Sequence, residues 1–295
     1  MLEINKLYKS FGNKVVLDGL DLEVQDGSIF GLVGINGAGK STLLRTIAGV
    51  YEPEQGTILL DGCDTYDDVK IRNNIAFVSD EAYFPIGSTI ESVKLLYQTM
   101  YEFSEEDYQK YLKMFELDEN ASIINLSNGN KRRVSLLFAL STKPKLLLLD
   151  EAYDGLEPLV RFKFKKALTE LIEEHNITVI ISSHNLKELE DICDSFGILE
   201  DGKMMEYGDL TDSKEIINKY QIVFDKDKSK EDFNQFDILH YEQEGRVYQI
   251  VIKGNQDEVL SKINDMHPIL VDVLQVNFEE LFIYELEKKE KNDAE

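Results

Sequence analysis

The 295-residue sequence predicts an α/β core that is interrupted by a helical insert and followed by a small α+β domain. Two observations predict the core: short apolar strands alternate with helical patterns, and a glycine-rich loop joins one such strand to a helix. A third observation separates the domains, because the pattern after Gly208 changes to closely spaced strands. We expect the core over residues 1–210, its insert at about 85–143, and the small domain over 211–295.

The composition argues against several function classes. With 32 Lys and Arg against 56 Asp and Glu, the formal net charge is −24, which disfavours binding to nucleic acid or to an anionic membrane surface. The two cysteines match neither a disulfide framework nor a zinc site, as expected for a reducing cytoplasm. No apolar stretch reaches the ~18 residues of a spanning helix, and no secretory signal begins the sequence. Any membrane role is therefore expected to need another subunit.

Elements of the core follow in order along the chain. Between Pro85 and Lys143 the strand patterns stop, and two amphipathic helices are expected there. Their N-caps are predicted at Ser88 and Ser104, because an acidic residue follows each serine three positions later. Apolar runs that are typical of buried strands lie outside this insert, at residues 2–8, 28–34, 74–79, 145–150 and 177–183.

Elements of the small domain are read in the same way. The helical patterns lie at residues 256–265 and 278–289. Together with the strands they predict a separate α+β unit. The strand patterns lie at residues 220–225, 237–245, 246–254 and 268–276.

The stretch GINGAGKST, Gly34–Thr42, has the spacing of a phosphate-binding loop and stands between a strand and a helix. Its glycines let backbone N–H groups turn towards phosphate oxygens, and the helix that follows points its positive dipole end at them. Lys40 adds a cation, and the Ser41 hydroxyl can ligate magnesium. The loop therefore predicts a nucleotide site formed by Asn36, Gly37, Gly39, Lys40, Ser41 and Thr42.

Acidic residues end another strand. The leucine run 146–149 delivers Asp150 and Glu151 to its carboxyl end, where ligand chemistry gathers in open α/β sheets. Asp150 is expected to hold magnesium through water, and Glu151 to orient or deprotonate the water that attacks a γ-phosphate. A solvated acid pair at a strand end is the alternative. His184 follows the strand 177–183 and is expected at the same edge, although a lone histidine is more often structural.

Together with LSNGN, Leu126–Asn130, which precedes a helix, these strand ends resemble the ATP-binding subunit of ABC transporters over roughly the first 220 residues. The resemblance implies a P-loop NTPase core of the ABC type, an ATPase with ATP and Mg²⁺ as ligands. It implies that Phe11 stacks on adenine; a core phenylalanine is the alternative. It also assigns Walker A to Gly34–Thr42, the signature to Leu126–Asn130, Walker B to Leu146–Glu151 with Glu151 catalytic, the D-loop to Gly155–Pro158, and the switch histidine to His184.

The same resemblance implies partners. In the family, two nucleotide-binding subunits pack head to tail, so Ser127, Gly129 and Asn130 of one copy would face the ATP of the other. The pair drives a membrane-spanning permease, which implies a peripheral position on the cytoplasmic face of the cell membrane. Residues 181–208 resemble bacterial ABC-2 type exporter motors. This implies export of peptides, antibiotics or similar amphipathic cargo.

Some residues depart from the family pattern. Asp80 stands where a glutamine is usual, and as a carboxylate it is expected either to ligate the magnesium or to weaken its binding. Asn128 and Asn130 replace a glycine and a glutamine of the signature. An ATP-binding regulator with little turnover and a soluble ABC ATPase without a transport role therefore stay open as alternatives. We interpret the cations of Lys131–Arg133 as a solvated helix face.

Overall fold

A six-stranded sheet of order β10-β9-β3-β8-β7-β6 carries the strands predicted for the core. From β9 through β6, neighbouring strands pair in parallel. The carboxyl ends of these strands therefore lie along one edge of the sheet. The strands are β3 (Ile29–Val33), β6 (Ile75–Val78), β7 (Leu146–Asp150), β8 (Thr178–Ser183), β9 (Ser195–Glu200) and β10 (Lys203–Asp209).

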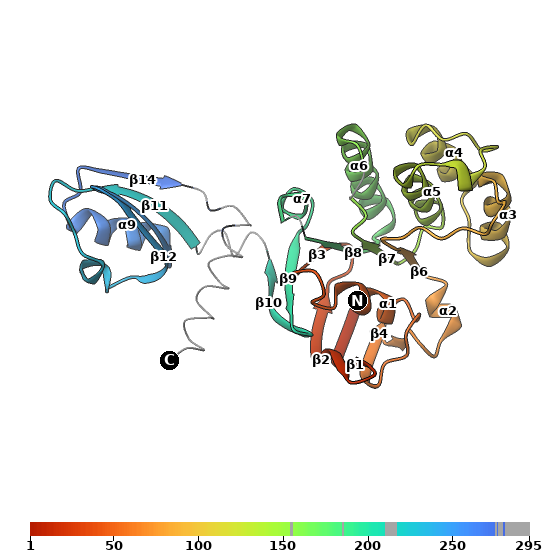
Figure 1. Cartoon of the computed structure of the whole chain (residues 1–295), viewed down its shortest axis with the longest axis horizontal. Helices are drawn as coiled ribbons and strands as arrows, with labels where there is room; N and C mark the ends of the chain where they lie inside the picture. Colours follow the sequence, from red (N-terminus) through yellow and green to blue (C-terminus); the bar gives the residue numbers. More distant parts are fainter. Residues whose placement is uncertain (154–155, 185, 210–216, 275, 277–279, 281–295) are drawn as a thin grey trace. The chain divides into compact units, whose positions relative to one another are not determined.

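The structure is a computed structural model and describes residues 1–153, 156–184, 186–209, 217–274, 276 and 280. The chain forms two units, Met1–Tyr207 and Gly208–Glu295 (Figure 1). The boundary predicted after residue 210 falls within 210–216, outside the described residues. In the part that is described, no helix has the length and apolar character needed to cross a bilayer.

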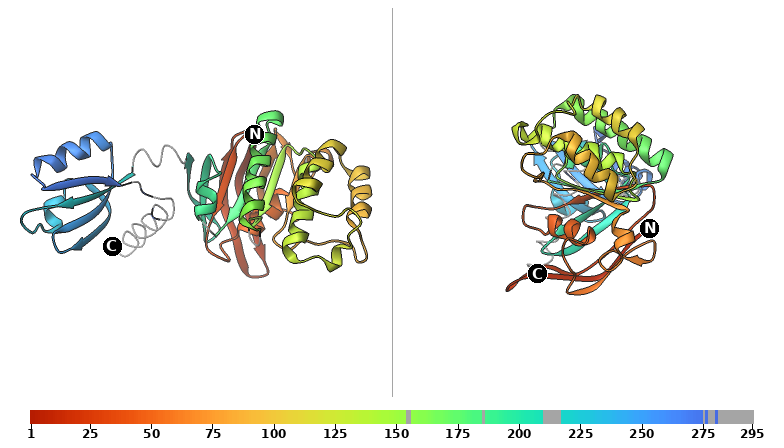
Figure 2. Two further views of the ribbon diagram at one scale, coloured as in Figure 1. Left: turned by 90° about the horizontal axis from the view of Figure 1, so that it is seen from above. Right: turned by 90° about the vertical axis from the view of Figure 1, so that its right-hand side faces the viewer.

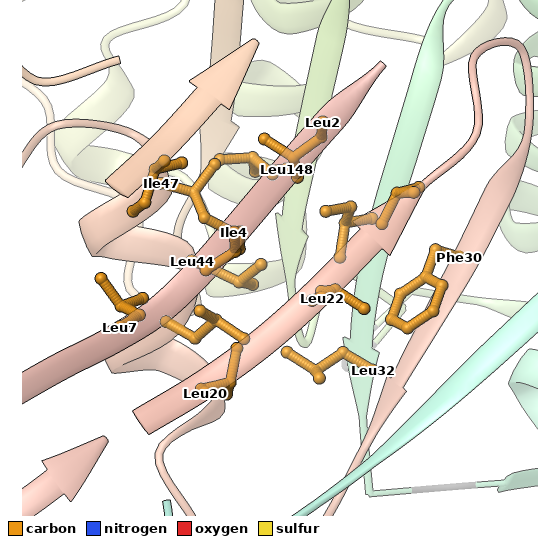
Figure 3. Packing of buried hydrophobic residues seen from close by; sticks show 14 of the residues in the cluster. Leu2, Ile4, Leu7, Leu20, Leu22, Phe30, Leu32, Leu44, Ile47 and Leu148 are labelled. Carbon is orange, nitrogen blue, oxygen red and sulfur yellow. The ribbon is translucent and has the colours of Figure 1, made fainter. Parts of the chain in front are cut away.

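A second sheet of the first unit is antiparallel, with the order β2-β1-β4-β5. Helix α1 (Lys40–Ile47) contacts both β2 and β7 and so joins the two sheets. Side chains from these elements form one core, in which Leu2, Leu44 and Leu148 are fully buried (Figure 3). Each such leucine contributes about 1.5–3 kcal/mol through burial. The strands are β1 (Leu2–Phe11), β2 (Lys14–Val24), β4 (Gln55–Leu60) and β5 (Cys63–Asp64), and the short helix α2 spans Val69–Arg72.

The predicted insert consists of helices that gather next to β6 (Figure 1) and stay together at one end of this unit in the further views, coloured from orange-yellow to yellow-green (Figure 2). The N-cap predicted at Ser104 is confirmed, because its hydroxyl accepts a hydrogen bond from the Asp107 N–H. The N-cap predicted at Ser88 is wrong. Thr89 and Ser92 form the capping box instead, and this register buries Ile90. The helices are α3 (Ile90–Met100), α4 (Glu105–Met114) and α5 (Asn128–Ser141), with a 3₁₀ turn, η1, at Ile123–Asn125.

Two further helices accompany the parallel sheet. Helix α6 (Pro158–His175) connects β7 to β8, and α7 (Leu186–Glu190) follows β8. Proline suits the first position of α6 because its missing N–H would have no partner there. Asn176 ends the helix in the left-handed conformation, with φ of 53°.

The second unit is an antiparallel sheet of order β12-β13-β11-β14 with helix α9 (Gln256–Asp265). Its own core centres on buried aromatic side chains, among them Phe224, Phe233 and Tyr248. The four predicted strands and the helix at 256–265 are confirmed. The helix predicted at 278–289 lies outside the described residues apart from Glu280. The strands are β11 (Ile217–Val223), β12 (Asp237–Glu244), β13 (Val247–Lys253) and β14 (Leu270–Leu274), with a 3₁₀ turn, η2, at Lys230–Phe233.

Candidate nucleotide site

A pocket of about 530 Å³ lies at the carboxyl edge of the parallel sheet. The loop after β3 and the ends of β6, β7 and β8 all contribute to it, as the strand order requires. Predicted site residues that line it are Asn36, Gly37, Gly39, Lys40, Ser41, Thr42, Asp80, Glu151 and His184.

The loop between β3 and α1 shapes one wall of the pocket. Gly39 is the N-cap of α1 and has φ of 111°, a conformation that L side chains rarely adopt. A Cβ at Gly34 would come within 2.4 Å of the Leu199 carbonyl oxygen. These glycines therefore let the loop curl tightly, and the start of α1 opens into the pocket with its N–H groups.

Lys40 is nearly buried, with 6% of its surface exposed. Its ammonium donates to the Gly34 carbonyl at 2.7 Å and lies 3.7 Å from Glu151 Oε1. Burial lowers the pKa of Lys40, while the nearby charges of Glu151 and Asp150 oppose that shift. A phosphate in the pocket would favour the ammonium form, because a second anion close by stabilises the charge.

Asp150 is fully buried at the end of β7. Its Oδ1 accepts hydrogen bonds from the hydroxyls of Ser41, at 3.1 Å, and Ser182, at 2.7 Å. Its Oδ2 is buried without a hydrogen-bond partner. Since Mg²⁺ prefers oxygen ligands and an unpaired buried carboxylate oxygen is costly, this set of oxygens fits the predicted magnesium.

Glu151 lies between two cationic or polar neighbours. Its Oε2 is 2.6 Å from Nδ1 of His184, which follows β8, and its Oε1 faces the Lys40 ammonium. Its backbone has φ of 51°, in the left-handed region, and its N–H donates to the carbonyl and hydroxyl oxygens of Ser182. The structure thus brings Glu151 and His184 together, as the strand order predicts.

Asp80 follows β6 and lines the same pocket, but its carboxylate has protein partners. Oδ1 accepts from the Arg45 guanidinium on α1 at 2.9 Å and from the Ser79 hydroxyl at 2.9 Å. Arg45 therefore balances the charge that departs from the family pattern. Arg45 could not be predicted as this partner from the sequence, because only its helical spacing from Lys40 indicates that it is near.

Arg132 corrects the interpretation of Lys131–Arg133 as a solvated face. Its guanidinium lines the pocket and donates to the backbone carbonyls of Glu151, at 2.5 Å, and Asp80, at 2.6 Å. Arg133, with 14% of its side chain exposed, pairs with Glu157 at 3.1 Å. The packing of α5 against β6 turns these side chains towards the sheet edge.

The predicted signature lies elsewhere. Ser127 caps α5, its hydroxyl accepting from the Asn130 N–H at 3.3 Å. Gly129 borders a second pocket of about 490 Å³ with Asp80 and Arg132. Ser127, Gly129 and Asn130 do not line the first pocket.

One other predicted position, Phe11, stays apart from this site. Phe11 is 45% exposed, packs edge-to-face on Tyr51 and does not line the pocket. Lys14 and Val16 of β2 line it instead. Gly155 of the predicted D-loop lies outside the described residues.

Comparison with known proteins fits this geometry. The sequence profile described as ABC transporter matches residues 17–154. The ABC transporter ATP-binding protein YtrB of Bacillus subtilis (strain 168) is 30% identical over 284 residues, which cover 96% of this chain and 97% of YtrB. The chain belongs to the ABC transporter family. The predicted P-loop ABC fold is thereby confirmed, and the chain is an ATP-binding subunit that hydrolyses ATP.

Two other similar proteins show the breadth of this family. The methionine import ATP-binding protein MetN of Staphylococcus saprophyticus is 29% identical over 300 residues, covering 94% of this chain and 87% of MetN. The solved ATP-binding cassette MJ0796, a dimer in a post-hydrolysis state bound to ADP and Pi, superposes with a TM-score of 0.64 at 25% identity. That alignment covers 71% of this ABC subunit and 99% of MJ0796.

Proposed function

We propose that the pocket at the end of β3 binds ATP with Mg²⁺ and that Glu151 is the residue that activates water for hydrolysis. The observation that carries this proposal is the meeting of Lys40, Asp150, Glu151 and His184 at one sheet edge. Phosphate chemistry needs a cation, oxygen ligands for a metal, and a base close together. A solvated acid pair, the alternative from sequence, would not be buried between these partners.

Each residue has a role in the proposed reaction. The loop N–H groups and Lys40 hold the β- and γ-phosphates. A water oxygen attacks the γ-phosphorus while Glu151 accepts its proton, and the bond from that phosphorus to the bridging oxygen breaks, which leaves ADP and phosphate. His184, hydrogen-bonded to Glu151 Oε2, orients the carboxylate.

Ser41 and Asp150 would hold Mg²⁺, which neutralises charge on the phosphates when it is bound. Ser182 keeps the Asp150 carboxylate in one orientation through its hydroxyl at 2.7 Å. The Asp80 carboxylate is less available to ligate Mg²⁺ than its position in the sequence suggests, because its Oδ1 already accepts hydrogen bonds from Arg45 and Ser79.

The first test is Glu151→Gln. The amide keeps the shape of the side chain but loses the base, so we expect ATP affinity to stay within about twofold and turnover to fall at least about a hundredfold. Phosphate release and fluorescent-nucleotide titration measure the two quantities. Glu174→Gln on an exposed part of α6 is the matched control. Turnover close to that of the unmodified chain would remove Glu151 from the reaction and favour a different water-activating group.

We further propose that this motor works as a pair with a membrane-spanning permease, held at the cytoplasmic face of the membrane. The position of the signature supports the pairing of two nucleotide-binding subunits. Ser127 and Gly129 do not line the ATP pocket of their own chain, so they are available to contact the nucleotide of a second copy or of a related chain. Exposed apolar side chains of the helical insert support the permease, since isolated proteins rarely leave such surface uncovered. They are Ile86, Leu95, Leu96, Met100 and Ile124.

Export of peptides, antibiotics or similar amphipathic cargo is our proposal for the direction of transport. The resemblance of residues 181–208 to ABC-2 exporter motors supports it. The name of MetN, a methionine import protein, supports the opposite direction. Transport of cargo across vesicles that carry the permease, measured after this chain and ATP are added, distinguishes export from import. Cargo loss from the side that holds the motor supports export, and cargo gain on that side contradicts it.

A further inference from the structure

Arg132 connects parts of the site that come from three separate segments. It lies in the first turns of α5, six residues from Leu126, the first residue of the signature. One guanidinium nitrogen donates to the Glu151 carbonyl at 2.5 Å, and another donates to the Asp80 carbonyl at 2.6 Å. The side chain therefore links the signature helix to the ends of β7 and β6 in the same chain.

The Glu151 carbonyl belongs to a backbone that needs support. With φ of 51°, Glu151 is a non-glycine residue in the left-handed region, where steric crowding disfavours L side chains. Such conformations persist when the surrounding structure holds them. Ser182 holds the N–H side of the residue, and Arg132 holds the carbonyl side.

Backbone torsion decides where the Glu151 carboxylate points, because φ and ψ set the direction of the bond from Cα to Cβ. In the conformation held by Ser182 and Arg132, Oε1 faces Lys40 and Oε2 faces His184. A change of φ or ψ at Glu151 would turn the bond from Cα to Cβ relative to the strand and so move the carboxylate away from Lys40 and His184.

We propose that Arg132 is a positioning residue for ATP hydrolysis, which acts by holding the backbone of Glu151 and tying it to the signature helix. The inference rests on the proposed role of Glu151. In a pair, the signature of one copy would contact the nucleotide of the other copy. Arg132 would then couple the two sites, because it ties the catalytic Glu151 of its own site to the signature helix that serves the other site.

An arginine suits this role because its planar guanidinium offers several N–H groups at fixed angles and spans two carbonyls at once. A lysine ammonium is a single point of charge on a flexible stem and can replace one bond but not the pair. Arg132→Lys keeps the charge but loses the planar fork, whereas Arg132→Gln loses both, so comparing the two substitutions separates the effect of geometry from the effect of charge.

The test measures steady-state ATP hydrolysis and fluorescent-nucleotide affinity of the full chain. We expect Arg132→Gln to lower kcat about tenfold or more, since small displacements of a catalytic group cost that much, with nucleotide Kd changed less than about twofold. Arg132→Lys should fall between this variant and the unmodified chain. Lys166→Gln, which removes an exposed cation of α6, is the control for charge. Thermal melting checks that each variant is folded, and if Arg132→Gln does not fold, the kcat of Arg132→Lys decides.

A double variant ties the effect to Glu151. In single-turnover experiments, adding Arg132→Gln to Glu151→Gln should give no further loss, because both changes remove one function. An additive loss overturns the inference, as does an unchanged kcat in a folded Arg132 variant while Glu151→Gln is inactive. A raised Kd with unchanged kcat also overturns it, since Arg132 would then shape the pocket alone. If Glu151→Gln itself remains active, the proposed function fails first, and this inference fails with it.

Discussion

Asp80 is the residue at which this chain departs most clearly from the family pattern near the phosphates. The sequence alone leaves open whether its carboxylate ligates the magnesium or weakens magnesium binding, and predicts that Asp80→Gln lowers the magnesium concentration needed for hydrolysis. The structure adds the ion pair with Arg45, in which the two side chains are 40% and 29% exposed. The charge of Asp80 is thus balanced by Arg45 of α1, the helix that follows the phosphate-binding loop.

The prediction at this scale is that Arg45→Gln raises the magnesium concentration for half-maximal hydrolysis by roughly two- to fivefold. A half-exposed ion pair of up to about 1 kcal/mol allows a change of that size. The carboxylate left behind would repel the phosphates unless more magnesium screens it. Magnesium titration of phosphate release measures the shift.

The double variant Arg45→Gln with Asp80→Gln should restore the original magnesium dependence, since both charges are then absent. Lys70→Gln, an exposed cation of α2, serves as the control. If Arg45→Gln and the unmodified chain give the same titration curve, Asp80 acts outside the reach of the metal.

Among the elements, β7 combines structural and chemical roles. Its residues Leu146–Asp150 are all buried, because the strand lies between β8 and β6 and is covered on both faces. The four leucines place Asp150 and Glu151, so a packing defect in the strand should reach the site.

We predict that Leu148→Ala destabilises the chain by about 2–5 kcal/mol, the cost of a cavity in a core that cannot collapse. Leu148 is fully buried against residues of β1 and α1 (Figure 3). Urea unfolding followed by fluorescence or circular dichroism measures the change. The matched control is Leu95→Ala, whose side chain is 60% exposed, with an expected effect within about 0.5 kcal/mol. Equal effects of the two substitutions would contradict the packing described for β7.

At the scale of the whole molecule, each of the two units has its own buried core. All described residues of the nucleotide pocket belong to the first unit. The second unit has a different architecture, an antiparallel sheet with α9, and supplies none of these residues. The described residues that form the nucleotide pocket thus come from the first unit alone.

We predict that a chain ending at Asp209, after β10, folds and binds nucleotide with an affinity within about twofold of the full chain. Basal turnover or the lifetime of an ATP-bound dimer is the quantity that the small unit should change. Nucleotide titration measures the affinity, phosphate release measures the basal turnover, and sedimentation with ATP measures the dimer. A folded truncation that no longer binds nucleotide would show that the small unit completes the site.

Local patterns predicted much of this molecule. The loop Gly34–Thr42, the buried strands and the cap at Ser104 depend on neighbours within a few residues, so their spacing is readable in the sequence. The parallel order of strands then brings Asp150, Glu151 and His184 to one edge. A local pattern can still predict the wrong one of two adjacent residues. Thr89 caps α3 in place of the predicted Ser88, in a register that buries Ile90.

Contacts between distant segments could not be read in the same way. The bond from Arg45 to Asp80 spans 35 positions, and those from Arg132 to Glu151 and Asp80 span 19 and 52. Such contacts depend on how whole helices pack on the sheet, and no local spacing encodes that packing. The sequence by itself therefore determined the family, the loop and the strand ends. Only the tertiary structure decided which charges balance Asp80 and what holds the backbone of Glu151.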